Sequence, residues 1–119
     1  MEERRKFPRI EYRQPVQYQR ADTNTVEGCV AFDLSEGGLR FRAEDFIGLN
    51  TEVFCDIPLE GEQTVRMTGR IMWVQKVPHA ENYHVGLEFV DNSSTLESKI
   101  PLGKYLKEKQ VNVVKGAQK

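Results

Sequence analysis

Apolar and polar residues alternate with a period of two along most of the chain, from residue 16 to residue 90. Successive side chains of a β-strand point to opposite faces, so this pattern predicts strands with one buried face rather than helices. Residues typical of turns, mainly glycine, proline and asparagine, separate the alternating segments. The predicted strands are residues 16–20, 26–35, 39–42, 53–59, 65–75 and 83–89.

Six strands with short connections predict an antiparallel sheet. The connections leave no room for the crossover helix that a parallel βαβ unit requires. A chain of 119 residues can bury about two-thirds of its surface, which is enough for one core. Curling the sheet into a small barrel would close its edges. We therefore expect an all-β fold, a six-stranded antiparallel β-barrel, with one C-terminal helix.

The C-terminal helix is predicted from a change of period after residue 90. Ser94 to Glu97 has the form of a capping box, and the apolar residues that follow have helical spacing. Pro101 interrupts this pattern, because proline inside a helix costs about 3 kcal/mol. Proline is favourable at the first position of a helix, so we expect a short turn at Ser94 and a helix from about Pro101 to about Gln110.

The chain is expected to contain three regions. Residues 1–12 form a basic N-terminal lead-in, residues 13–110 form the barrel with its helix, and residues 111–119 form a flexible tail. Within the second strand, the even-numbered residues 26–34 share one face and the odd-numbered residues 29–35 share the other. The glycines at 37 and 38 predict a tight turn with positive φ after this strand.

Charge is distributed unevenly along the chain. Residues 1–20 hold six basic and three acidic side chains, whereas residues 21–90 hold five basic and twelve acidic ones. Nucleic-acid coats need a basic face, so the acidic body argues against binding of DNA or RNA. It also disfavours a barrel for single-stranded nucleic acid, which would need aromatic residues interleaved with cations.

Other features point to a cytoplasmic protein. No apolar run approaches the ~20 residues that span a bilayer, so membrane insertion is not expected. The N-terminus leads into no apolar segment of a secretion signal. Cys29 and Cys55 lack CxxC spacing, and a reduced pair is favoured over a disulfide.

Catalytic chemistry finds little support in the sequence. The two histidines, His79 and His84, have no metal-ligand spacing, and Ser35 has no neighbouring base to activate it. Phosphate-binding glycine loops of the common types are absent. We therefore expect no catalytic residue, no metal site, no cofactor and no enzyme activity.

Two motifs suggest recognition of an anionic ligand instead. Arg5 and Arg9 form an RxxxR pattern, which is weak because it recurs at Arg9/Arg13 and Arg66/Arg70. Asp33 to Gly38 has the form DxSxxG, which is less expected by chance. Its simplest explanation is a turn in which the Asp and Ser side chains bond backbone amides. The same side chains could also face a ligand.

With both motifs in this order, the sequence resembles the PilZ domain family. The similarity continues in residues 69–74, like the long strand of the family, and in residues 84–89, like its final strand. It extends over roughly residues 4–110. The resemblance implies a six-stranded PilZ-like split barrel with a helix at one end. It also implies binding of the bacterial second messenger cyclic di-GMP through Arg5 and Arg9 and through Asp33, Ser35 and Gly38.

The chemistry of this ligand fits the two motifs. Arginine forks match phosphates and the O6/N7 edge of guanine, while the N1–H/N2–H edge suits a carboxylate. Arg4 can supply a third guanidinium. The expected ligand-binding residues are Arg4, Arg5, Arg9, Asp33, Ser35, Gly37 and Gly38.

The lead-in is expected to be mobile until the ligand orders it against the barrel. The ordered surface would then act on an unidentified downstream protein, with the receptor as a monomer or weak homodimer. The alternative is a PilZ-like adaptor that binds protein and no nucleotide.

Overall fold

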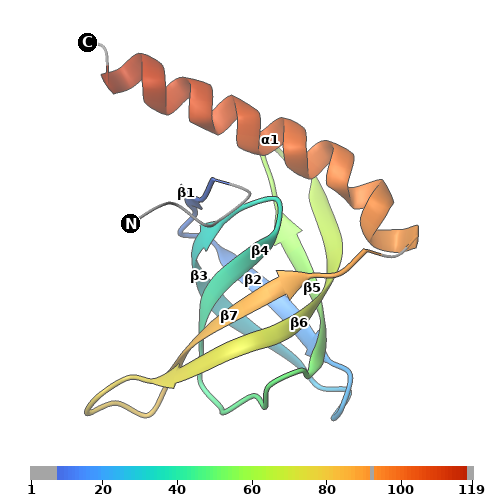
Figure 1. Ribbon diagram of the computed structural model, residues 1–119, viewed down its shortest axis with the longest axis vertical. Coiled ribbons are helices and arrows are strands. Elements are labelled where there is room, and N and C mark those ends of the chain that lie inside the picture. The colour runs from blue at the N-terminus through green and yellow to red at the C-terminus, as the bar shows by residue number, and fades with distance from the viewer. Residues whose placement is uncertain (1–7, 92, 118–119) are drawn as a thin grey trace.

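The computed structural model describes residues 8–91 and 93–117, which form an antiparallel barrel with a helix across one end (Figure 1). The elements are β1 (Ile10–Glu11), β2 (Pro15–Arg20), β3 (Val26–Leu34), β4 (Gly38–Ala43), β5 (Glu52–Pro58), β6 (Thr64–Lys76), β7 (Tyr83–Phe89) and α1 (Ser93–Ala117). The six longer strands lie where the alternation predicts them, with ends that differ by at most one residue.

The six longer strands close into a ring. Neighbours follow the order β3-β2-β5-β6-β7-β4, and β4 pairs back onto β3. All these pairings are antiparallel. Because the ring is closed, each of the six strands has a paired neighbour on both sides. This arrangement confirms the predicted barrel. The short β1 adds a further pairing, to the end of β3 beyond β2.

The barrel interior is filled by apolar side chains from every long strand and from α1. The fully buried side chains include Tyr18, Leu34, Phe41, Ile57, Met67, Ile71, Val85 and Leu102. Burying each large apolar side chain contributes about 1.5–3 kcal/mol, so this cluster provides much of the stability of the fold.

The alternation of faces in β3 is interrupted, which the sequence pattern did not predict. The pairing of β3 with β4 shifts register between Ala31 and Asp33, at a β-bulge. Ala31 and Leu34 are both fully buried although they lie three residues apart, while Val26 and Val30 are exposed. The even-numbered residues therefore do not share one face. The bulge turns Leu34 into the core as β3 reaches the motif.

The C-terminal helix also differs from the prediction. It runs without a break from Ser93 to Ala117 and contains Pro101. The expected restart near Pro101 and the expected end near Gln110 are therefore wrong, and residues 111–117 are helical. The helix begins at Ser93, within one residue of the predicted turn at Ser94. Pro101 is the ninth residue of α1, so it removes a backbone donor from inside the helix, and packing of the helix against the barrel compensates for this local cost.

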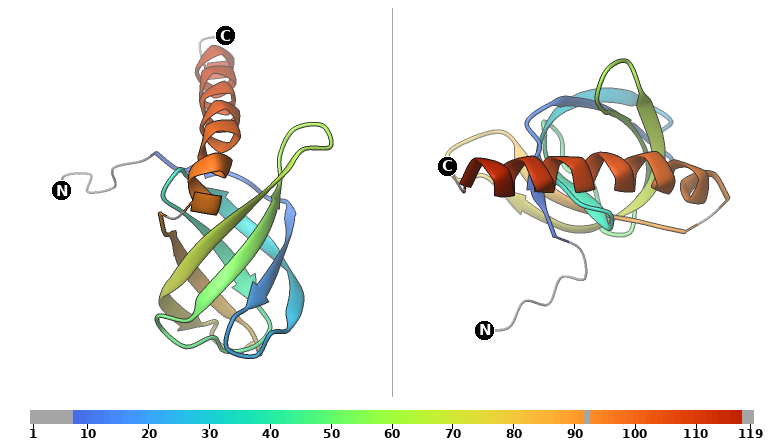
Figure 2. Two further views of the ribbon diagram at one scale, coloured as in Figure 1. Left: turned by 90° about the vertical axis from the view of Figure 1, so that its right-hand side faces the viewer. Right: turned by 90° about the horizontal axis from the view of Figure 1, so that it is seen from above.

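Helix α1 lies across one end of the barrel (Figure 2). Leu102 and Leu106 are buried beneath it, and the ring of Tyr105 meets that of Tyr12 edge to face at 6.2 Å. The Tyr12 hydroxyl donates a hydrogen bond to the carbonyl of Pro58. Ser98 donates to the carbonyl of Arg66 at 2.9 Å. The helix is thus attached to the barrel by apolar packing and by polar contacts.

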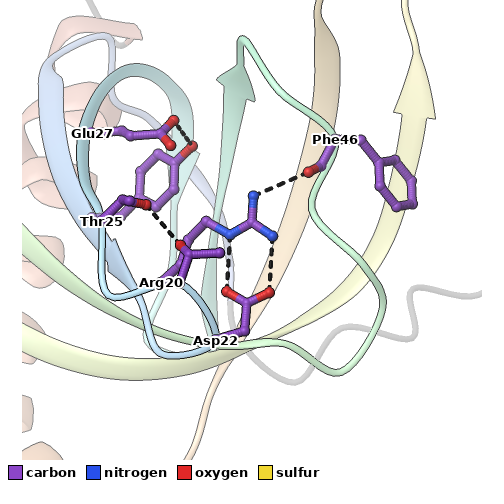
Figure 3. Close-up of polar contacts among 7 residues, drawn as sticks. Arg20, Asp22, Thr25, Glu27 and Phe46 are labelled. Carbon is purple, nitrogen blue, oxygen red and sulfur yellow. Dashed lines mark hydrogen bonds and ion pairs between the residues drawn. The ribbon is translucent and has the colours of Figure 1, made fainter.

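The opposite end of the barrel is held by Arg20 (Figure 3). Its guanidinium donates to both carboxylate oxygens of Asp22, at 3.1 and 2.9 Å, and to the carbonyl of Phe46 at 3.1 Å. These bonds tie the turn after β2 to the loop before β5.

Both cysteines are free thiols. The one helix among the described residues contains too few apolar residues to cross a membrane.

Candidate functional site

The DxSxxG residues form the hairpin between β3 and β4, at the end of the barrel that α1 covers (Figure 1). The amide of Ser35 donates to the carbonyl of Gly38 at 2.9 Å. The Ser35 hydroxyl accepts hydrogen bonds from the amides of Gly37 and Gly38, at 3.1 and 3.2 Å. Ser35 therefore shapes the turn in the way expected for a serine turn. Only 6% of Ser35 is exposed.

Glycine is required at position 38 for a reason other than the one predicted. Among the described glycines Gly61 has a positive φ, and Gly37 and Gly38 do not. A Cβ on Gly38 would instead lie 2.2 Å from the carbonyl oxygen of Leu87 on the neighbouring strand. The predicted left-handed turn is therefore wrong, and close approach of two backbones explains this glycine.

Asp33 lies at the end of β3 and is almost buried, with 8% exposed. Its Oδ2 accepts a hydrogen bond of 2.7 Å from Nε of Arg40 and a second bond from Nη2 of the same side chain. The two residues face each other across the hairpin, since Asp33 pairs with Arg40 in the β3–β4 register. Asp33 was expected to bond a backbone amide or the ligand, and the structure pairs it with a cation.

The first motif comes close to the second through β1. Ile10 pairs with Leu34 and Glu11 pairs with Asp33, so the antiparallel register brings Arg9 level with Ser35. Arg9 is exposed and precedes β1 directly. Arg4 and Arg5 lie outside the described residues. Arg9 of the first motif thus lies at one edge of the hairpin that carries the second motif, about two dozen residues later in sequence.

The outer face beside Asp33 carries further groups that bear on recognition. Along one row of the sheet, Arg40 on β4 pairs with Gly86 on β7, and Gly86 pairs with Trp73 on β6. The indole of Trp73 covers Gly86, since a Cβ there would lie 2.2 Å from Nε1. Trp73 is 37% exposed, so part of its ring is accessible on the outer face of the sheet. The row therefore presents a guanidinium next to a flat aromatic ring.

A second group of side chains follows one step along the same face. The ring of Phe32 contacts His84 edge to face at 4.7 Å, and the guanidinium of Arg13 lies 6.0 Å from the Phe32 ring centre. Arg42 pairs with His84 in the β4–β7 register. This part of the outer face therefore combines arginine side chains with aromatic rings, and Arg13 is itself paired with Glu11 at 2.6 Å.

The hairpin also touches the helix. Glu36, in the middle of the second motif, has its Oε2 3.1 Å from the position of a Cβ on Gly103 of α1. Glu36 and Gly103 line a shallow surface pocket together with Lys104 and Lys107. The hairpin and α1 therefore lie side by side at this point.

Sequence reasoning missed Arg40 as a member of this site. The signal that could have found it is an arginine two residues after the motif, on the outward face of the next strand. Pairing this arginine with Asp33 requires the bulge in β3, which the pattern did not reveal. Within residues 8–91 and 93–117, no group of three acidic, cysteine or histidine side chains could hold a metal ion.

Comparison with solved structures finds the same fold in several proteins of low sequence identity. The Bacillus subtilis inhibitor of motility MotI/DgrA is 18% identical with a TM-score of 0.73, over 92% of this chain and 52% of that chain. This chain therefore spans about half the length of that protein. At such identities the likeness concerns the fold.

Two isolated domains match over nearly their whole length. The PilZ domain of CeSA from a cellulose-synthesizing bacterium is 24% identical with a TM-score of 0.62, over 84% of this chain and 98% of that chain. The PilZ domain of Escherichia coli YcgR, solved with c-di-GMP, is 14% identical with a TM-score of 0.65, over 95% and 99%.

A search among curated proteins found no match. The family comparison is decisive, since the model of the PilZ domain matches residues 3–106, most of the chain. Together with the barrel, the hairpin and the arginine beside it, this match establishes that the chain belongs to the PilZ domain family.

Proposed function

We propose that this protein is a cytoplasmic receptor for cyclic di-GMP and that it acts by binding rather than by catalysis. Membership of the PilZ family supports this proposal, as does the likeness to the YcgR domain solved with c-di-GMP. The observation that carries it is the β1–β3 register, which brings Arg9 level with Ser35. Cationic and polar groups of two distant motifs then border one surface.

The ligand would lie on the outer face of the barrel beside the hairpin. Residues 4–13 hold four arginines and one lysine against one glutamate, so this segment suits the two phosphates. Ser35 uses its oxygen to accept from Gly37 and Gly38, which leaves its O–H as a donor to the ligand.

Binding would order the N-terminal segment against the hairpin and change a surface seen by a downstream protein. The contact between Glu36 and Gly103 offers a route from the ligand to α1. Each charge-assisted hydrogen bond would contribute about 1.5–3 kcal/mol, reduced by the entropy lost on ordering the segment. The receptor would act as a monomer or a weak homodimer.

Calorimetry with cyclic di-GMP tests the proposal directly. We expect binding to the whole chain, and we expect Arg5→Ala, Arg9→Ala and Asp33→Ala each to weaken it about tenfold or more, the effect of losing one charge-assisted bond. Arg66→Ala is the matched control, since Arg66 belongs to an RxxxR pattern on the far side of the barrel. Unchanged affinity in all three variants would refute the site.

A chain that gives no heat with the nucleotide and yet forms a stable complex with another protein would instead be an adaptor. NMR relaxation of residues 4–9 tests the ordering step. Equal rigidity with and without nucleotide would exclude it.

A further inference from the structure

We propose that Arg40, held by Asp33, is the group that recognises a guanine base, by donating two hydrogen bonds to its O6 and N7 atoms. This inference rests on the proposed function and assigns a role within that site. Asp33 is then a positioning residue, which acts on the ligand through Arg40.

The geometry of the ion pair supports this assignment. A guanidinium has five N–H groups arranged along two edges that can each make a bidentate contact. Asp33 occupies the edge formed by Nε and Nη2, with both bonds directed to Oδ2. The other edge, formed by one hydrogen of Nη1 and the second hydrogen of Nη2, is left for a ligand. The Arg40 side chain is 41% exposed, whereas that of Asp33 is 12% exposed.

Burial argues against a direct contact of Asp33 with the base. To accept from N1–H and N2–H of guanine, a carboxylate must turn both oxygens toward the ligand. Here the carboxylate lies almost buried and faces Arg40. Breaking this pair would leave a buried charge without its partner, which is strongly unfavourable. Keeping the pair and reading the base through Arg40 avoids that cost.

Charge explains why Arg40 would take a base and not a phosphate. The Asp33–Arg40 pair is neutral as a unit, so it offers no net attraction to an anion. Its outer edge still presents two donors with the spacing that matches O6 and N7, the commonest specific contact of arginine with guanine. The neighbouring indole of Trp73, one step along the same row over Gly86, supplies a flat surface suited to a purine. The net positive lead-in is the better partner for the phosphates.

Calorimetry with two ligands tests the inference: cyclic di-GMP, and its analogue with 7-deazaguanine, which lacks N7. The wild-type chain should bind the analogue about tenfold more weakly or worse, the discrimination expected of a bidentate arginine. In Arg40→Ala and Arg40→Lys the two ligands should bind within about threefold of each other, because neither side chain offers the planar fork. Arg40→Lys keeps the charge opposite Asp33, so it guards against loss of the fold.

Arg42→Ala is the matched control, since Arg42 lies on the same strand and is exposed. We call the factor by which the analogue binds more weakly than cyclic di-GMP the penalty. The Arg42→Ala variant should keep the penalty of the wild-type chain. Asp33→Asn should reduce the penalty while leaving the fold intact. A merely structural role of either residue would weaken both ligands equally and would leave the penalty unchanged.

The inference is overturned if the wild-type chain binds the two ligands equally, or if the penalty persists in the Arg40 variants. It is also overturned if an inosine analogue, which lacks the 2-amino group, binds ten times more weakly and Asp33→Asn removes this loss. Such a result would place Asp33 on the base itself. Absence of any binding of cyclic di-GMP to the wild-type chain would refute the proposed function instead, so the two failures are distinguishable.

Discussion

Gly38 lies so close to Leu87 on the adjacent strand that a Cβ at position 38 would come within 2.2 Å of the Leu87 carbonyl oxygen. The atom it would meet belongs to the backbone of β7, which pairs with β4 along its whole length. The strand therefore cannot move aside without losing hydrogen bonds. This contact fixes the base of the hairpin that carries Asp33 and Ser35.

We expect Gly38→Ala to lower the free energy of unfolding by about 1–3 kcal/mol, as other overpacking substitutions do. Gly28→Ala is the matched control, because Gly28 lies on the neighbouring strand β3 and a Cβ there would meet nothing within 4 Å. Its effect should stay within about 0.5 kcal/mol. Urea denaturation of both variants measures the difference. Equal stability of the two would show that β7 yields to the extra methyl group.

Attachment of α1 to the barrel depends on its buried face. Leu102 is fully buried under the helix, whereas Ile100, two residues earlier, is 78% exposed. We expect Leu102→Ala to cost about 2–5 kcal/mol because it leaves a cavity, and Ile100→Ala to cost about 0.5 kcal/mol or less. Thermal and urea unfolding of the two variants check this. Similar losses in both would mean that the helix does not pack as described.

Buried thiol and tyrosine hydroxyl groups make the stability of the fold sensitive to high pH. Burial raises the pKa of the Cys29 thiol to about 12, with a smaller contribution from Glu27. Burial also raises the pKa of Cys55 and Tyr18 above their ordinary values. Each group binds its proton more tightly in the folded chain than in the unfolded chain. Its contribution to the free energy of unfolding is therefore complete at pH values below its pKa in the unfolded chain, about 8.5 for a thiol. It is lost as the pH rises toward the folded value.

The free energy of unfolding should therefore fall from about pH 8.5 upward, and less steeply in Cys29→Ala than in the wild-type chain. Urea denaturation at a series of pH values between neutrality and about pH 10 measures both slopes. Identical slopes would show that Cys29 keeps its ordinary pKa. Changes below about pH 8 report other groups and do not bear on this prediction.

The sequence by itself determined the barrel strands and the presence of the C-terminal helix. Alternation is a local property, because each strand buries one face whichever strand it pairs with. The same locality explains why the Ser35 turn was predictable: its hydroxyl bonds amides two and three residues away. Pattern and motif together also sufficed to expect the family.

The tertiary structure alone decided how the site is assembled. Whether Pro101 interrupts α1 depends on packing against the barrel, which outweighs local propensity. The need for glycine at position 38 comes from Leu87, 49 positions away in the chain. The partner of Asp33 depends on a bulge that shifts the register of β3 against β4. Such contacts join segments distant in sequence, and no local pattern specifies which side chains a closed barrel brings face to face.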